Sequence, residues 1–167
     1  MDILIVPLDQ SRCDDVAVLE EICFGTDAWP CEAFTELLGT YRDSPDFRGQ
    51  VWVALQEPSR ELVGYVALEV SSLGEAELTN LAVAPASRQQ GVGRLLTAFV
   101  ASVCRERGIN LLWLRVRKSN TQAVKFYESC AFAIRGEFRD YYEEPSEDAL
   151  ILARDLAEEG DGEGSTK

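Results

Sequence analysis

A short segment rich in arginine and glycine, Arg88-Gln89-Gln90-Gly91-Val92-Gly93-Arg94, has the residue types needed to hold a chain of phosphates. It follows a predicted strand at 77–83 and precedes apolar residues at helical spacing. The first N–H groups of a helix have no intrahelical partner, and the helix dipole favours an anion beside them. The two glycines allow close approach, and the two arginines can add charge-assisted hydrogen bonds. The segment therefore predicts a pyrophosphate-binding loop, although two glycines before a helix also form ordinary turns.

The spacing of this loop differs from that of two common phosphate-binding motifs. The third position after Gly93 is Leu96, so the dinucleotide pattern G-x-G-x-x-G is not met. No Gly-Lys-Ser/Thr follows, which excludes the P-loop of nucleotide hydrolases.

The composition restricts the chemistry further. The 167 residues include no histidine, which excludes Ser-His-Asp and Cys-His sites and any His-ligated metal, and we expect no metal. The net charge of −13 argues against nucleic-acid binding and fits cationic partners such as amines or basic peptides, although acidity also serves solubility alone. No apolar run reaches the length of a membrane span. Five cysteines without a C-x-x-C pair predict reduced thiols in a cytoplasmic protein.

The elements that must position the loop alternate between strand and helix patterns. Strands are predicted at 3–6, 51–57, 62–70, 77–83, 111–117, 132–139 and 148–153. Helices are predicted at 11–24, 30–39 and 95–108, with a short helix capped by Ser119 or Asn120. The segment 40–50 is polar and predicted to turn. This order predicts an α/β fold with a mixed central sheet flanked by helices, in a single domain at 1–156, followed by an acidic, disordered tail at 157–167.

Three ordered motifs resemble the GNAT superfamily of acetyl-CoA-dependent N-acetyltransferases. Leu81-Ala82-Val83, then Pro85, then Arg88-x-x-Gly91-x-Gly93, is similar to its acetyl-CoA motif Q/R-x-x-G-x-G/A. A second match runs from Leu112 to Glu128, and a third joins Tyr141-Tyr142 to Glu147-Asp148-Ala149. Together they resemble the RimI-like ribosomal-protein alanine acetyltransferases and related N-terminal acetyltransferases over most of residues 75–152.

The resemblance implies a GNAT-like domain, acetyl-CoA as cosubstrate, and acetyl transfer to a primary amine by direct attack in a ternary complex. It implies that backbone groups of Leu81 and Val83 pair with the pantetheine arm, and that the Val83 N–H can stabilise the oxyanion. Asn120 would contact the cofactor near the same arm, or act only as a helix cap. The cofactor-binding residues expected are Leu81, Ala82, Val83, Arg88, Gln89, Gln90, Gly91, Val92, Gly93, Arg94 and Asn120.

The acid and the base are the catalytic residues to identify. Tyr127 matches the general acid of the family, which protonates the leaving thiolate, or is simply a core residue. RimI-like enzymes carry a glutamate where this chain has Arg115, which stays protonated and cannot be a base. Glu77, five residues before Ala82, holds the spacing of the base in other GNAT enzymes, or is a solvated strand residue. Ala131 stands where the family usually has glycine, which predicts a strained or a different turn.

The acceptor is predicted to be the N-terminal α-amine of a protein or peptide. Trp29, Tyr141 and Tyr142 are expected to bind it, since the resemblance places the substrate between the first helix–helix loop and the last hairpin. Alternatives are a small amine, an antibiotic or a lysine side chain, and a CoA-binding module that has lost catalysis. The protein is expected to act as a monomer or homodimer.

Overall fold

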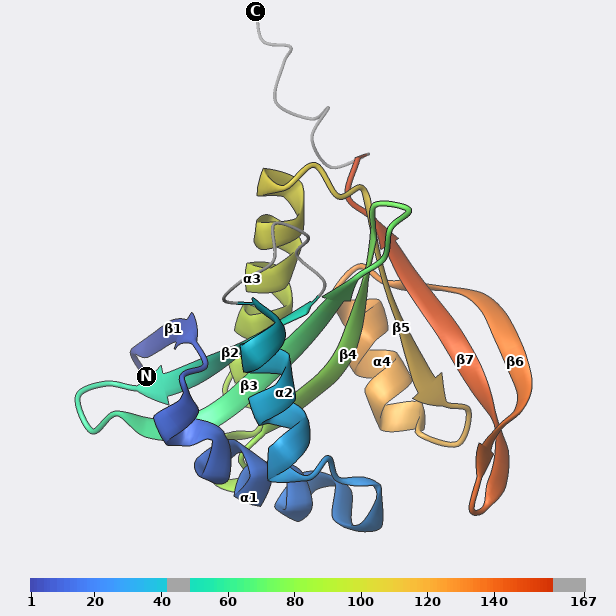
Figure 1. Ribbon diagram of the computed structural model, residues 1–167. Helices are drawn as coiled ribbons and strands as arrows, with labels where there is room; N and C mark the ends of the chain where they lie inside the picture. Colours follow the sequence, from blue (N-terminus) through green and yellow to red (C-terminus); the bar gives the residue numbers. More distant parts are fainter. Residues whose placement is uncertain (42–48, 158–167) are drawn as a thin grey trace, which may run out of the picture. The chain divides into compact units, whose positions relative to one another are not determined.

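The computed structural model describes residues 1–41 and 49–157, whose elements follow the order expected from the sequence (Figure 1). They fall into two compact units. Unit 1 contains residues 1–70 and 78–100, and unit 2 contains residues 71–77 and the chain from Ala101 onward. The turns predicted at 40–50 lie mostly outside the described residues, but the prediction was too long at both ends, because residues 40–41 are helical and residues 49–50 are in a strand. The tail predicted from 157 onward also lies almost wholly outside the described residues and stays a prediction.

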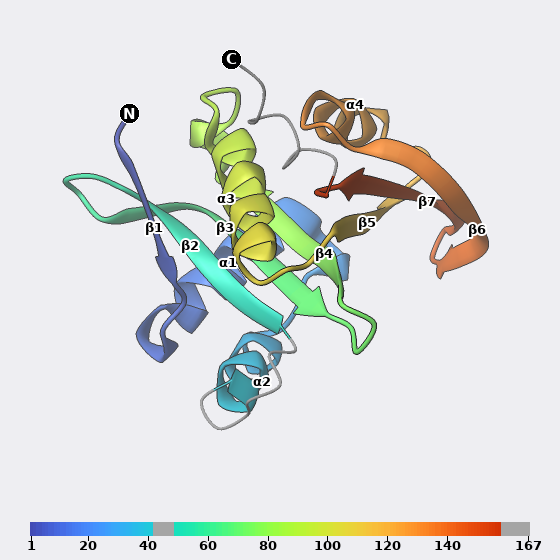
Figure 2. The same cartoon turned by 90° about the horizontal axis from the view of Figure 1, so that it is seen from above.

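Unit 1 is built on antiparallel strands with helices on both faces. Its elements are β1 (Ile3–Pro7), α1 (Cys13–Phe24), α2 (Cys31–Tyr41), β2 (Gly49–Gln56), β3 (Glu61–Val70), most of β4 (Glu75–Val83) and the first turns of α3 (Val92–Glu106). β1 pairs with β2, and β2 with β3. Figure 2 shows α3 on one face of these strands and α1 and α2 on the other.

The two covered faces explain why the central strands of unit 1 are apolar along their whole length. Residues 51–55 of β2 and 63–68 of β3 are buried without a polar alternation. Phe34 of α2, Tyr65 of β3 and Leu96 of α3 are fully buried in this unit. Gly64 of β3 lies close to its neighbours in this unit, since an added Cβ would lie 2.9 Å from the Ala82 carbonyl oxygen of β4.

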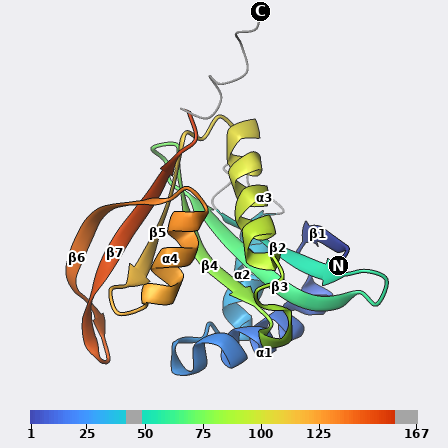
Figure 3. The same cartoon turned by 180° about the vertical axis from the view of Figure 1, so that it is seen from behind.

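Unit 2 combines the start of β4 with β5 (Leu111–Arg117), α4 (Thr121–Ser129), β6 (Ala133–Glu143) and β7 (Ser146–Asp155). β4 pairs with β5 in parallel over Glu75–Glu77, β5 is antiparallel to β7, and β7 is antiparallel to β6. The seven strands therefore have the order β1-β2-β3-β4-β5-β7-β6. Side chains alternate along β5, so that Leu112, Leu114 and Val116 are buried. Figure 3 shows α4 beside β5.

The structure differs from the expected elements mainly at their ends. The last two strands are longer than predicted, since β6 continues to Glu143 and β7 begins at Ser146. Aromatic rings on this extension stack on arginines of β5, a contact that local patterns do not reveal. Ala131 has φ +68°, which favours the strained turn over the different turn, the two alternatives expected there. Within the described residues, no helix has the length and apolarity needed to cross a membrane.

Candidate active site

The predicted pyrophosphate loop lies in unit 1, between β4 and α3. Arg88, Gln89, Gln90 and Gly91 are all exposed, and α3 begins at the next residue. Gly91 has φ +87° and Gln89 has φ +60°, so the chain takes a turn of left-handed backbone before the helix. Such a turn brings successive N–H groups toward one side, as an anion requires. The exposed loop and the N-terminal end of a 15-residue helix therefore fit a pyrophosphate.

Arg88 points back along the chain to the end of β4. Its Nε donates to the Val83 carbonyl oxygen at 3.1 Å, and its Nη2 lies 3.5 Å from the Cys23 Sγ atom. Cys23, at the end of α1, donates to the same carbonyl at 3.7 Å. Val83 and Ala84 are thereby fixed, since the Ala84 N–H also donates to the Val63 carbonyl oxygen at 2.8 Å. Arg88 thus stabilises the end of β4 through a hydrogen bond and also places a positive charge at the loop.

The position of α3 depends on a close approach that the sequence analysis missed. A Cβ added at Gly64 would lie 3.2 Å from Leu96 Cδ1 and 3.3 Å from Val92 Cγ1. Both residues are buried on the first turns of α3. Glycine at this point of β3 therefore lets the helix that carries the loop pack directly on the strands. The sequence feature that could have predicted this close approach is a glycine inside an otherwise apolar strand.

A buried carboxylate, also missed, connects α1 to β3, β4 and the α1–α2 segment. Glu20 is fully buried, and its side chain accepts hydrogen bonds from the Tyr65 hydroxyl, Asn80 Nδ2 at 2.8 Å and the Trp29 N–H at 3.2 Å. Burial raises the pKa of Glu20 above its ordinary value, while the three donors oppose that change. Trp29, which is predicted to bind the acetyl acceptor, is thereby connected to β4. The sequence feature that could have revealed this site is a glutamate, Glu20, among the apolar residues on one face of α1, one turn after Val16.

Unit 2 places Glu77 against Arg115. The guanidinium makes three hydrogen bonds to the carboxylate, with Nε and Nη2 at 2.9 and 2.6 Å from Oε1 and Nη2 at 2.7 Å from Oε2. The Glu77 side chain is 14% exposed and that of Arg115 is 28% exposed. The Arg115 guanidinium also lies 5.0 Å from the ring centre of Trp113 and 5.1 Å from that of Tyr141. Glu77 is therefore mostly buried and paired with an arginine, with a small part of its side chain open to solvent.

Tyr141 and Tyr142 lie at the end of β6 and belong to the same aromatic and cationic face. The Tyr142 ring lies 4.1 Å below the guanidinium of Arg117, which also pairs with Glu147 at 3.5 Å. Hydrogen bonding from Ser119 lowers the pKa of Glu147 and keeps this partner charged. The two tyrosines are thus held by cation–π contacts rather than left as free loop residues.

Tyr127 and Asn120 lie on α4. Asn120 caps the helix, with its Oδ1 accepting from the Ala123 N–H at 3.1 Å. Tyr127 is half-buried and packs edge-on against Phe126 and Phe132. Burial raises the pKa of Tyr127 well above the ordinary phenol value, so its hydroxyl keeps its proton at neutral pH. A phenol in this state can act as a proton donor.

The predicted site residues therefore form two groups. Unit 1 brings together the end of β4, the loop and the start of α3, with Trp29 tied to β4 through Glu20. Unit 2 brings together Glu77, Tyr141 and Tyr142 around the arginines of β5, with Tyr127 and Asn120 on α4. Each group has its own chemistry: anion and backbone contacts in unit 1, and proton donors and acceptors in unit 2.

The sequence matches the acetyltransferase (GNAT) family over residues 14–132. It is 35% identical over 108 residues to the [ribosomal protein bS18]-alanine N-acetyltransferase of Escherichia coli K12, which covers 64% of this chain and 73% of that one. The enzyme of the same name from Haemophilus ducreyi is 36% identical over 109 residues, with 64% and 75% covered.

Solved structures share the fold. The crystal structure of the ribosomal-protein-S18-alanine N-acetyltransferase from E. coli superimposes with a TM-score of 0.77 at 27% identity, covering 93% of this chain and 94% of that one. Ard1 from Thermoplasma volcanium gives 0.78 at 23% identity, covering 93% and 98%. The single domain with a seven-stranded mixed sheet is therefore confirmed. The chain belongs to the acetyltransferase (GNAT) family and is an acetyl-CoA-dependent N-acetyltransferase.

Proposed function

We propose that the acetyl acceptor is the N-terminal α-amine of a protein or peptide. The observation that carries this proposal is the similarity, at 35% identity, to enzymes named for acetylating the alanine of a ribosomal protein. The structure supports it with Tyr141 and Tyr142 held in place on β6, where rigid aromatic side chains can bind a peptide. We also propose a cytoplasmic location, because the relatives act on a ribosomal protein.

The chemistry requires a neutral amine to attack the thioester carbonyl. An α-amine with a pKa of about 7.7–8.0 is roughly 10–15% neutral at pH 7, whereas a lysine is neutral only to a few parts in ten thousand. An α-amine therefore needs less help from a base. That fits a chain in which an arginine, Arg115, occupies the position of the usual glutamate.

Glu77 is the proposed proton acceptor, acting through water. In the part of the chain that the structure describes, Oε2 of Glu77 accepts one hydrogen bond from Arg115. A carboxylate oxygen has two lone pairs, so one remains for a water molecule. Arg115 then serves to hold the carboxylate and to oppose a positive charge on the incoming amine. Tyr127 is the proposed acid, since its protonated phenol can deliver a proton to the departing thiolate.

Acetyl-CoA is proposed to bind the residues of unit 1 through its phosphates and pantetheine arm. The loop of Gln89 to Arg94 would hold the pyrophosphate, and the backbone of Leu81 to Val83 would pair with the arm. Arg88 would fix that backbone, as its bond to the Val83 carbonyl indicates. Asn120, already a helix cap, would add a contact near the arm.

The test incubates the protein with acetyl-CoA and a panel of acceptors. The reaction is followed by measuring the CoA thiol released and the mass of the product. We expect acetylation of peptides with free N-termini and no reaction with the same peptides blocked at the N-terminus. Acetylation confined to polyamines, antibiotics or lysine side chains would replace the proposed acceptor while leaving the family and cosubstrate unchanged. Tight acetyl-CoA binding without turnover on any amine would instead support a binding module.

A further inference from the structure

A groove of about 400 Å³ lies between α1 and the segment leading into α2, wholly within unit 1. Asp14, Val18 and Glu21 line it from α1, where their i, i+4, i+7 spacing puts them on one helix face. Trp29 and Pro30 line the opposite side. We call this the α1–α2 groove. Val18 is 57% exposed, so the groove offers apolar surface between two carboxylates.

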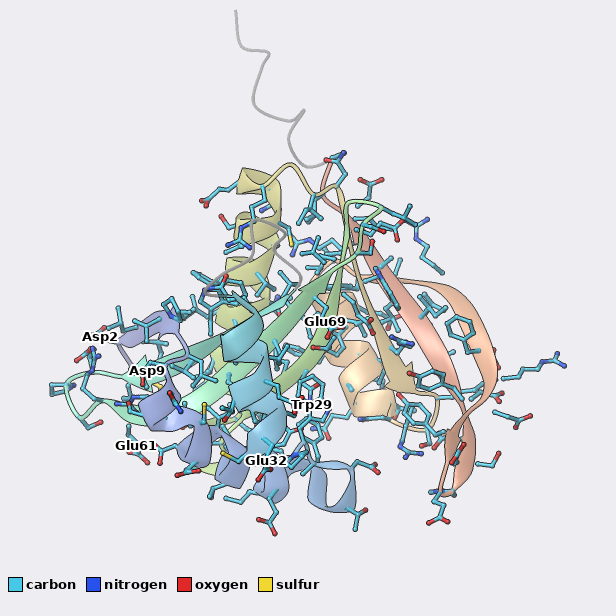
Figure 4. All side chains as sticks on the ribbon, viewed as in Figure 1. Asp2, Asp9, Trp29, Glu32, Glu61 and Glu69 are labelled. Atoms are coloured by element: carbon cyan, nitrogen blue, oxygen red, sulfur yellow. The ribbon has the colours of Figure 1, made fainter. Side chains whose placement is uncertain are left out.

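The charge around this groove has one sign. Residues 13–41 contain seven Asp and Glu and no Lys or Arg, which is more than half of the net −13 of the whole chain. One of the seven, Glu20, is buried, while Asp14 and Glu21 are exposed at the groove. Glu32 follows in the first turn of α2, at the same end of that helix as Trp29 (Figure 4). A ligand with positive charge complements this surface.

The same elements are fixed to the end of β4, where we place the acetyl group. The Trp29 N–H donates to Glu20, which accepts from Asn80 of β4 at 2.8 Å. Cys23 of α1 reaches the Val83 carbonyl oxygen at 3.7 Å. Cys23 and the groove residues Val18 and Glu21 lie on opposite faces of α1, because successive helix residues turn by roughly 100°. A peptide whose α-amine lies at the end of β4 therefore passes the C-terminal end of α1 before it follows the groove. From residue 14 to its last residue, 24, α1 is about 15 Å long, enough for about four extended residues.

We propose that the α1–α2 groove binds a basic segment of the acceptor polypeptide, within roughly the eight residues that follow its acetylated N-terminus. The aliphatic stems of lysine or arginine cover Val18, and their charged ends reach Asp14 and Glu21. The groove then selects acceptors by a part of the chain that does not react. This inference rests on the proposed function, because it needs a polypeptide acceptor.

The test compares two peptides with the same first three residues, one followed by lysines and arginines and the other by glutamines and serines. We expect kcat/KM about tenfold higher for the basic peptide at low salt, and near equality at high salt, because exposed charge pairs are weak and screened. Val18→Lys and Glu21→Lys should remove this preference by raising KM for the basic peptide. Both positions are exposed, so the fold should be kept, which thermal unfolding would check.

Glu61→Lys is the matched control, since Glu61 is an exposed acid of unit 1 on β3, outside the groove (Figure 4). It makes the same change in net charge as Glu21→Lys and should keep the preference. Equal rates for both peptides with the natural chain, or an equal loss in the control variant, would overturn the proposal.

Failure of the proposed function gives a different result. In that case no peptide is acetylated, and binding of the basic peptide with a blocked N-terminus is measured by calorimetry. Binding that Glu21→Lys abolishes and Glu61→Lys retains would uphold the groove. Absence of binding, or equal binding by both variants, would refute it.

Discussion

Replacing Glu77 in one variant and Arg115 in another distinguishes the contribution of their ion pair to stability from the contribution of Glu77 to catalysis. The two side chains are 14% and 28% exposed and share three hydrogen bonds of 2.6–2.9 Å. Exposed pairs contribute about 0.2–1 kcal/mol, and breaking a fully buried pair costs about 3–5 kcal/mol. The exposure of this pair lies between those two cases, so replacing either partner should lower the free energy of unfolding by about 2 kcal/mol. For a chain of this size, that lowers Tm by about 4–8 °C.

The matched variants are Glu77→Gln and Arg115→Gln, which should lose similar stability. Only the first removes the proposed proton acceptor, so it should lose about 10²-fold in kcat/KM at pH 7, the lower end of the range for general base catalysis. Its deficit should shrink as pH rises and the free amine becomes neutral without help. Arg115→Gln keeps the carboxylate but loses the group that holds it, so it should lose less activity than Glu77→Gln. Initial rates of thiol release from pH 6.5 to 9.5, at a temperature where both variants are folded, make the comparison.

Equal activity losses in the two variants, with a ratio that does not change with pH, would refute this reasoning. The pair would then be structural, and the α-amine would react without a protein base. A larger loss in Arg115→Gln than in Glu77→Gln would point instead to the guanidinium as the group that the reaction needs.

Four further variants test the site and its supports. Tyr127→Phe should lower kcat at least about 10²-fold with little change in acetyl-CoA affinity, measured by calorimetry, and unchanged kcat would exclude Tyr127 as the acid. Ala131→Gly should raise the free energy of unfolding by about 0.5–1 kcal/mol, because φ +68° strains alanine more than glycine and the residue is exposed; lower stability in urea would contradict this. Gly64→Ala should cost about 1–3 kcal/mol and weaken acetyl-CoA binding, since its Cβ would meet the backbone of β4 and two side chains of α3; unchanged affinity would show that the helix shift does not reach the loop. Burial raises the pKa of Glu20 above its ordinary 4.5, so the natural chain should lose stability relative to Glu20→Gln as pH rises from that value through the raised pKa; the opposite trend in Tm would mean that the three donors outweigh burial.

The sequence determined the features that depend on local pattern. Periods of two and 3.6 residues predicted the strands, the helices and their order, and β5 was predicted at its observed bounds. The loop before α3 was predicted from glycines and arginines at a strand-to-helix turn, and Gly91 has the positive φ that this turn needs. The strain at Ala131 was one of two alternatives expected there, because the family that the chain resembles usually has glycine at that position. Each of these rests on neighbours in the chain, so sequence alone carries the information.

The tertiary structure decided the partners of the reactive groups. Glu77 was expected to be available as a base, but parallel pairing of β4 and β5 brings it to Arg115, 38 residues further on. Arg88 was expected at the phosphates, but it also reaches the Val83 carbonyl oxygen. Glu20 received no role in the sequence analysis, because its three donors come from segments up to 60 residues away. Side-chain chemistry depends on burial and on charges nearby in space, and no periodicity along the chain records which distant strands the fold makes neighbours.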